Sequence, residues 1–157
     1  MEFEPGYAIL AGLIGGGVMA IMLYMGIVML PQQMKMNLFA MLGTMVLPAG
    51  AAAFVMGAMM HAVMSVVFGL AHGAVFAAAD IDSSEAAWGL LFGLVHWAVV
   101  GMALGMLPLM HRGMRDGEMD APGFYALSYP PMTAMGFLML HLVFGVIVGA
   151  LYGTWAG

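Results

Sequence analysis

Four long stretches of the chain are apolar from end to end, and short polar segments separate them. A run of about 20 apolar residues is enough to cross a membrane as a helix. The pattern therefore predicts four spans, over residues 7–30, 49–79, 86–110 and 131–155. Residues 33–46 mix polar and apolar positions, which predicts a short helix at the membrane interface. We expect an all-α fold: a polytopic membrane four-helix bundle plus this interfacial helix, as a single transmembrane domain over residues 1–157.

Composition supports the membrane prediction and excludes several kinds of cofactor site and partner. Hydrophobic residues make up 64% of the chain and charged residues 7%, a balance that water-soluble domains do not have. The chain has no cysteine, which excludes thiolate metal sites, iron–sulfur clusters and covalent haem attachment. The net charge of −5 comes with no basic patch, so nucleic acid is not an expected partner. No nucleophile stands beside a general base and an acid, so an enzyme is not the favoured interpretation.

The basic residues predict an orientation in the membrane. Lys35, Arg112 and Arg115 are the only lysine and arginine residues, and all lie in the two loops on one side of the predicted spans. By the positive-inside rule, the loops that carry Lys35 and Arg112 face the cytoplasm and both termini face outside.

Three of the predicted spans carry a histidine well inside them, at His61, His96 and His141. Counted from the cytoplasmic side, these residues lie at similar depths of about 15–21 Å. Ionisable residues at such a depth are rare and indicate a functional site. His72 and His111 lie near span ends, where a solvated or interfacial side chain is expected.

The preferred interpretation is a transition-metal site used in metal handling or transport. Imidazole binds copper, zinc and iron, and the thioethers of a chain with 21 methionines would favour copper. The expected ligands are His61, His96, His141, Met60, Met64 and Met102.

Two alternatives stay open at the sequence level. A non-covalent haem b could take two of these histidines as axial ligands in an electron carrier, with space for the ring at Gly57, Gly93, Gly101 and Gly145. A cofactor-free accessory or structural subunit would use the histidines only for hydrogen bonds between helices. Gly145, Gly149 and Gly153 form a small-residue stripe for close helix packing, which favours a homo-oligomer or a larger membrane complex beside the lipid bilayer.

Four blocks of the sequence carry a family resemblance. They are MNLFAMLGTM at 36–45, MHAVMSVVFG at 60–69, GLVHWAV at 93–99 and GFLMLHLVFGVIVGALYG at 136–153. In these blocks the chain resembles small four-span bacterial and archaeal integral membrane proteins grouped under a domain of unknown function. The GxxHW and HLVFGxxxG patterns are the most specific parts. The resemblance implies a four-span layout in a prokaryotic cytoplasmic (inner) membrane, and it implies no particular activity.

Overall fold

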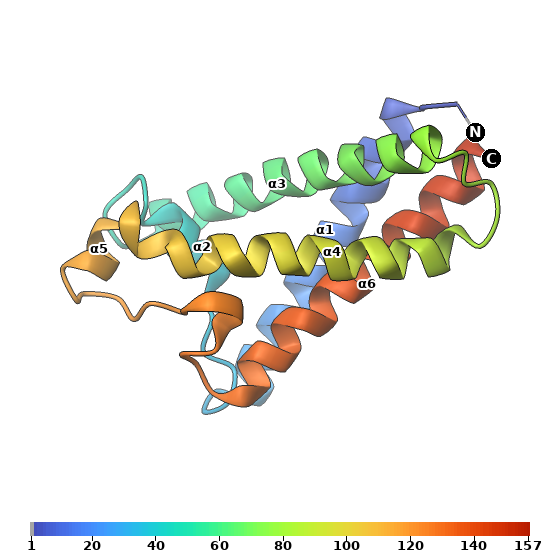
Figure 1. Cartoon of the computed structure of the whole chain (residues 1–157). Coiled ribbons are helices and arrows are strands. Elements are labelled where there is room, and N and C mark those ends of the chain that lie inside the picture. The colour runs from blue at the N-terminus through green and yellow to red at the C-terminus, as the bar shows by residue number, and fades with distance from the viewer. Residues whose placement is uncertain (1) are drawn as a thin grey trace. The chain divides into compact units, whose positions relative to one another are not determined.

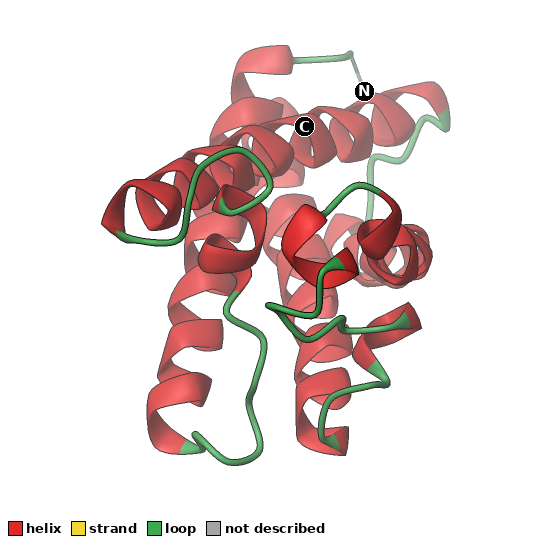
Figure 2. Ribbon diagram, turned by 90° about the vertical axis from the view of Figure 1, so that its left-hand side faces the viewer, coloured by secondary structure: helices red, strands yellow, loops and turns green. Residues whose placement is uncertain are grey.

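The computed structural model describes residues 2–157 and is built from helices and loops, with no strand in that range (Figures 1 and 2). Its four long helices are α1 (Pro5–Met29), α3 (Ala51–Ala78), α4 (Glu85–Met106) and α6 (Pro131–Ala156). All four are long and apolar enough to cross a membrane, the third together with the 3-10 turn η1 (Leu107–Leu109) that follows α4. The all-α fold class predicted from the sequence is therefore confirmed.

The expected interfacial helix is shorter than predicted. It appears as α2 (Leu38–Gly43), which Asn37 caps by accepting a hydrogen bond from the Ala40 amide at 3.2 Å. At the other end the Thr44 hydroxyl donates to the Ala40 carbonyl oxygen at 2.7 Å. These two local bonds confine the helix to the middle of the predicted range. The other short elements are α5 (Arg112–Arg115) and the 3-10 turn η2 (Phe124–Ala126).

The chain forms two compact units, and each long helix contributes to both. The first unit contains residues 2–22, Ala62–His96 and Met139–Gly157. The second unit contains Leu23–His61 and Trp97–Leu138. The candidate site and the loop pocket described below each lie wholly inside one unit.

In the first unit the four long helices form a bundle whose closest contacts are made at glycines. A Cβ atom at Gly12 of α1 would collide with the Ser65 carbonyl oxygen of α3, and one at Gly145 of α6 would collide with the Gly89 carbonyl oxygen of α4. Backbone therefore meets backbone at both contacts, as small residues allow in membrane helices. The predicted glycine stripe on α6 does pack closely, but against a helix of the same chain, since Gly149 faces the backbone of Glu85.

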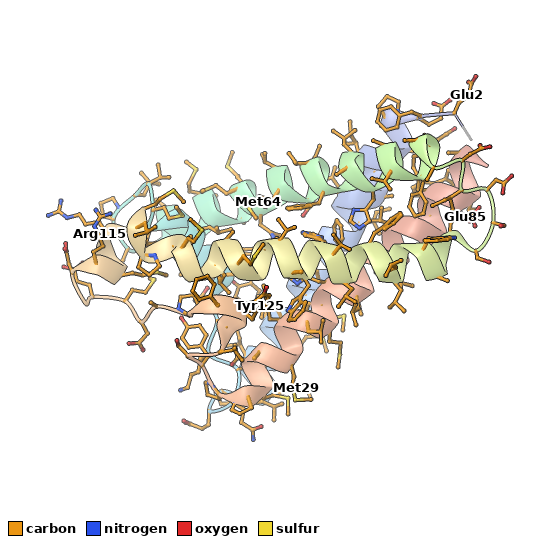
Figure 3. The ribbon with its side chains drawn as sticks, in the orientation of Figure 1. Glu2, Met29, Met64, Glu85, Arg115 and Tyr125 are labelled. Carbon is orange, nitrogen blue, oxygen red and sulfur yellow. The ribbon has the colours of Figure 1, made fainter. Side chains whose placement is uncertain are left out.

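The two ends of the chain meet in the first unit (Figure 1). Tyr152 of α6 is fully buried, and its phenol oxygen accepts a hydrogen bond from the Glu4 amide at 3.0 Å. The rings of Tyr7 and Trp155 lie 6.1 Å apart. Glu2 and Glu85 lie at this same end of the unit, which thus carries acidic side chains (Figure 3).

His111 organises the short helices of the second unit. Its Nδ1 accepts a hydrogen bond from the Met114 amide at 3.3 Å and so caps α5. Its Nε2 lies 3.0 Å from the Thr44 hydroxyl and 3.2 Å from the Met41 carbonyl oxygen, both in or beside α2. The side chain is only 1% exposed, so the expectation of a solvated His111 was wrong. The reason is that its two ring nitrogens join two short helices and satisfy backbone groups there.

Candidate functional site

His96 and His141, two of the three histidines predicted to share a site, lie side by side in the first unit. Their ring centroids are 4.7 Å apart and their planes nearly perpendicular, at 81°. Gly93, one turn before His96 on α4, packs directly against the backbone of His141 on α6. Because a Cβ atom there would strike the His141 carbonyl oxygen, the glycine of the GxxHW block is what lets the two imidazoles approach.

His72 of α3 is the third member of the cluster. Its ring centroid lies 5.8 Å from that of His96, and the residue is 4% exposed. The expectation of a solvated His72 was therefore wrong: its ring points into the bundle, where Phe144 of α6 is 5.6 Å away. Helical spacing contained the missing signal, since Phe68, His72 and Phe76 recur four residues apart and so share one face of α3.

The hydrogen bonding of His72 fixes which ring nitrogen carries the proton. Its Nδ1 lies 2.7 Å from the Phe68 carbonyl oxygen, which can only accept, so Nδ1 is the donor. In the neutral ring the Nε2 atom then carries a lone pair. That atom is buried and has no hydrogen-bond partner in the structure. A buried acceptor without a partner costs free energy, on the order of 1–3 kcal/mol, and therefore calls for an explanation.

Aromatic rings enclose the three histidines. The Phe68 ring stacks on His96 with centroids 3.6 Å apart, and Phe144 lies 5.2 Å from the same imidazole. Phe92 lies 6.0 Å from His72. The helical segments of this unit, 5–22, 62–78, 85–96 and 139–156, contain one charged residue, Glu85 at the start of α4, eleven residues before His96. The cluster is thus a neutral, nitrogen-bearing patch in apolar surroundings, and we call His72, His96 and His141 the histidine cluster.

The other residues predicted as ligands divide between the two units. His61, Met60 and Met102 belong to the second unit, where the buried His61 ring lies 5.7 Å from Phe39. Met102 is 50% exposed. Met64 is the one predicted methionine in the unit that holds the histidine cluster, and it is partly buried. The structure thus brings together His96 and His141, and adds His72 to them.

The distances from the His96 ring to the other two rings are close to those of a shared metal site, although the site is not preformed. Two imidazoles on one metal ion, with metal–nitrogen bonds of about 2.0–2.1 Å, have centroids roughly 5–5.5 Å apart. The observed 4.7 and 5.8 Å lie on either side of this range. Within residues 2–157 no group of three or more His, Cys, Asp or Glu side chains already has metal-site geometry. Ring rotations are therefore required before the nitrogens can converge.

The four glycines expected to leave room for a haem ring are in contact with protein atoms. Gly93 faces the His141 backbone and Gly145 faces Gly89, both in the first unit. In the second unit Gly57 faces the Phe39 backbone, and Gly101 lies under the ring of Tyr125. Each of these glycines serves helix or loop packing.

Comparison with known proteins found no matching family model, no matching curated protein and no matching solved structure.

Proposed function

We propose that this protein is an integral membrane protein that binds a transition metal ion, with copper(I) preferred, through His72, His96 and His141. One observation carries the proposal: the buried Nε2 lone pair of His72, which has no hydrogen-bond partner and belongs to a ring 5.8 Å from His96. A metal ion is an electron-pair acceptor that such a lone pair can bind.

The hydrogen bond at the opposite side of the His72 ring supports the same role. Metal-ligating histidines commonly donate their second N–H to a carbonyl oxygen, which fixes the tautomer and aims the coordinating nitrogen. His72 donates to the Phe68 carbonyl oxygen in this way. Phe68 also stacks on His96, so one residue positions two members of the cluster.

Copper(I) is preferred because of charge and ligand type. A monovalent ion is less costly than a divalent one to bury where no carboxylate compensates it. The one carboxylate in the long helices of the first unit is that of Glu85, at the start of α4 and eleven residues from His96. Neutral imidazole is a suitable ligand for copper. Met64 is the predicted thioether donor that belongs to the same unit as this set.

The test is a copper(I) titration of the detergent-purified protein against a chromogenic copper(I) chelator under anaerobic conditions. Roughly one ion per chain should bind in the wild type. His72→Phe, His96→Phe and His141→Phe keep an aromatic ring but remove the nitrogens, and each should weaken binding by roughly tenfold or more. His61→Phe is the matched control, because it removes a buried membrane histidine from the other unit.

Two results would contradict the proposal. The first is a wild-type protein that takes no copper(I) from the chelator. The histidine cluster would then serve only polar packing between helices, and the chain would be interpreted as a cofactor-free accessory subunit. The second is a loss of copper binding in His61→Phe as large as that in the cluster variants. It would favour the site predicted from depth along the spans, which is formed by His61, His96 and His141. Circular dichroism and a single size-exclusion peak for each variant separate lost binding from lost folding.

We further propose that the protein lies in a cytoplasmic membrane with the loops of Lys35 and Arg112 on the cytoplasmic side. Both loops belong to the second unit, whereas Glu2, Glu85 and the chain ends belong to the first. The positive-inside rule supports this orientation.

A further inference from the structure

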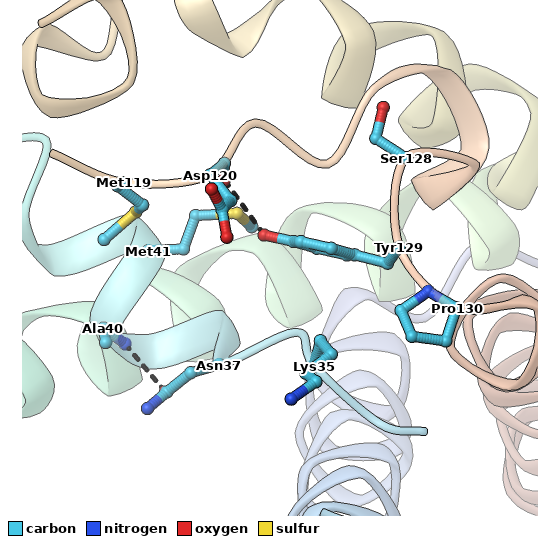
Figure 4. A pocket seen from close by; sticks show the side chains of 9 residues that line it. All are labelled: Lys35, Asn37, Ala40, Met41, Met119, Asp120, Ser128, Tyr129 and Pro130. Atoms are coloured by element: carbon cyan, nitrogen blue, oxygen red, sulfur yellow. Dashed lines mark hydrogen bonds between the residues drawn. The ribbon is translucent and has the colours of Figure 1, made fainter. Parts of the chain in front are cut away.

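A pocket lined by both polar and apolar side chains lies in the second unit, where two of the long helices end. It has a volume of about 410 Å³, within the range of small-ligand sites. Its lining comes from the segment after α1 and from the loop before α6. Figure 4 shows Asp120 and Tyr129 on one side of it and Lys35 and Asn37 on the other. The pocket is distant in the sequence from the histidine cluster and belongs to the other unit.

The walls of this pocket are held in place by specific hydrogen bonds. Thr133, 1% exposed, donates to the Gln33 carbonyl oxygen at 2.6 Å and accepts from the Lys35 amide at 3.1 Å. The segment that carries Lys35 is thereby fixed to the first turn of α6. On the other wall the Tyr129 hydroxyl donates to the Asp120 carbonyl oxygen at 3.0 Å. Both charged residues of the pocket thus stand on anchored backbone.

The pocket offers one positive and one negative group that do not neutralise each other. Neither Lys35 nor Asp120 forms an ion pair with another side chain within residues 2–157. The Asn37 side-chain oxygen is already used by the Ala40 amide and the Tyr24 hydroxyl, which leaves its NH₂ group to donate. Burial, and secondarily the charge of Asp120, raise the pKa of the Tyr129 phenol above its ordinary value, so this hydroxyl keeps its proton.

Apolar surface begins directly beside these polar groups in the chain. Met29, at the end of α1, is 71% exposed, and Figure 3 marks its position. Pro130 lines the pocket, and Met132 and Met135 follow on α6 with 39% and 62% exposure. These side chains belong to helices apolar enough to cross a membrane, so acyl chains are their natural neighbours. A ligand with a charged head and apolar tails matches the combination.

We propose that this pocket binds the zwitterionic head group of phosphatidylethanolamine from the surrounding bilayer. Lys35 and the Asn37 NH₂ group donate to the phosphate, and the Asp120 carboxylate accepts from the primary ammonium. Charge-assisted hydrogen bonds of this kind are stronger than neutral ones. Phosphatidylcholine is disfavoured because its quaternary ammonium has no N–H to donate. Phosphatidylglycerol is disfavoured because it would leave Asp120 without a counter-charge.

The test is native mass spectrometry of the detergent-solubilised protein with an equimolar mixture of these three lipids. Phosphatidylethanolamine adducts should exceed each of the other two by about tenfold, as expected for one charge-assisted bond. Lys35→Gln and Asp120→Asn should each abolish the preference. Arg112→Gln and Asp116→Asn are matched controls, because these exposed residues pair with each other at 3.1 Å and lie outside the pocket lining.

Three outcomes would overturn the proposal: equal retention of the three lipids, a preference that survives both pocket variants, or stronger retention of phosphatidylglycerol. A competition experiment then distinguishes a lipid head group from a soluble zwitterion. Soluble glycerophosphoethanolamine at equal concentration should not displace the lipid, because it lacks the tails that contact the helices. If it binds as tightly as the lipid, the pocket serves a soluble zwitterion and the lipid proposal is wrong. Because the two sites share no residue, copper binding is not affected by any of these results.

Discussion

At the scale of single residues, the nitrogen partners of each histidine distinguish a structural role from a candidate ligand. His111 and His72 are both nearly fully buried. Both ring nitrogens of His111 have hydrogen-bond partners, whereas His72 has a partner at Nδ1 and none at Nε2. A buried imidazole whose hydrogen bonds are complete has no lone pair to give to a metal. His111 is therefore expected to act on stability alone.

His111→Ala should lower the free energy of unfolding by roughly 2–3 kcal/mol, because it removes a helix cap and leaves buried backbone groups unsatisfied. His111→Asn should recover part of this loss, since a shorter side chain still caps α5 but does not reach α2. Arg112→Ala is the neighbouring control, with an 87% exposed side chain. Thermal unfolding followed by circular dichroism in detergent measures all three. Equal stability of His111→Ala and Arg112→Ala would show that the bonds to α2 and α5 contribute nothing.

At the scale of helices, some glycines lie against the backbone of a neighbouring helix and others face open space. The sequence alone does not tell the two kinds apart. Gly145 lies against the backbone of α4, where a methyl group would meet the Gly89 carbonyl oxygen and the Cα atom of Gly93. Gly17 of α1 has nothing within 4 Å of where its Cβ would be. Both glycines lie in helix interiors, where alanine is intrinsically favoured by roughly 0.5–1 kcal/mol. The surroundings of each glycine therefore decide whether its replacement by alanine raises or lowers the stability of the protein.

Gly145→Ala should destabilise the protein by roughly 1–3 kcal/mol, because backbone atoms have to move apart to admit the methyl group. Gly17→Ala should leave stability unchanged or raise it by a few tenths of a kcal/mol or more. The transition midpoint of denaturant unfolding in mixed micelles measures both. If the two substitutions have effects of the same sign and size, the close contact between α4 and α6 is not formed.

At the scale of the whole molecule, the basic residues are confined to one of the two units. All three lie in the second unit, together with Asp116, Glu118 and Asp120, whereas Glu2, Glu4, Asp80, Asp82 and Glu85 lie in the first. Loops that face opposite sides of a membrane differ in their access to a membrane-impermeant reagent. The chain has no cysteine, so a single introduced cysteine is the only thiol in the protein that a maleimide can label.

Asp82→Cys should react with an impermeant maleimide in intact cells, and Arg115→Cys should react only after the membrane is permeabilised. The expectation follows from the positive-inside rule. The readout is the mass shift of the labelled protein on a gel. Reversed accessibility of the two positions would invert the proposed orientation, and equal accessibility in intact cells would exclude a membrane-spanning arrangement of α4.

The long helices could be predicted from the sequence, whereas the membership of the histidine cluster could not. The length of an apolar run is a property of one segment, so the four long helices and their ends could be predicted closely. Which histidines meet depends on how far each helix is shifted along its neighbours, which apolar length does not reveal. Depth estimated from the predicted span ends placed His61 with His96 and His141, whereas in the structure His72, three turns further along the same face of α3, lies beside His96. The pocket around Lys35 and Asp120 was not predicted, because it depends on the path of two loops held by Thr133 and Tyr129.

The glycine contacts of the first unit also bear on how the chain is made. Gly12 joins α1 to α3, which are consecutive spans, and Gly89 joins α4 to α6, which are the next two. During biosynthesis each pair can close as a helical hairpin once its second span has left the ribosome, without waiting for the other pair. His96 and His141 belong to α4 and α6 and can meet when this second hairpin closes, whereas His72 of α3 joins them only when the two hairpins dock.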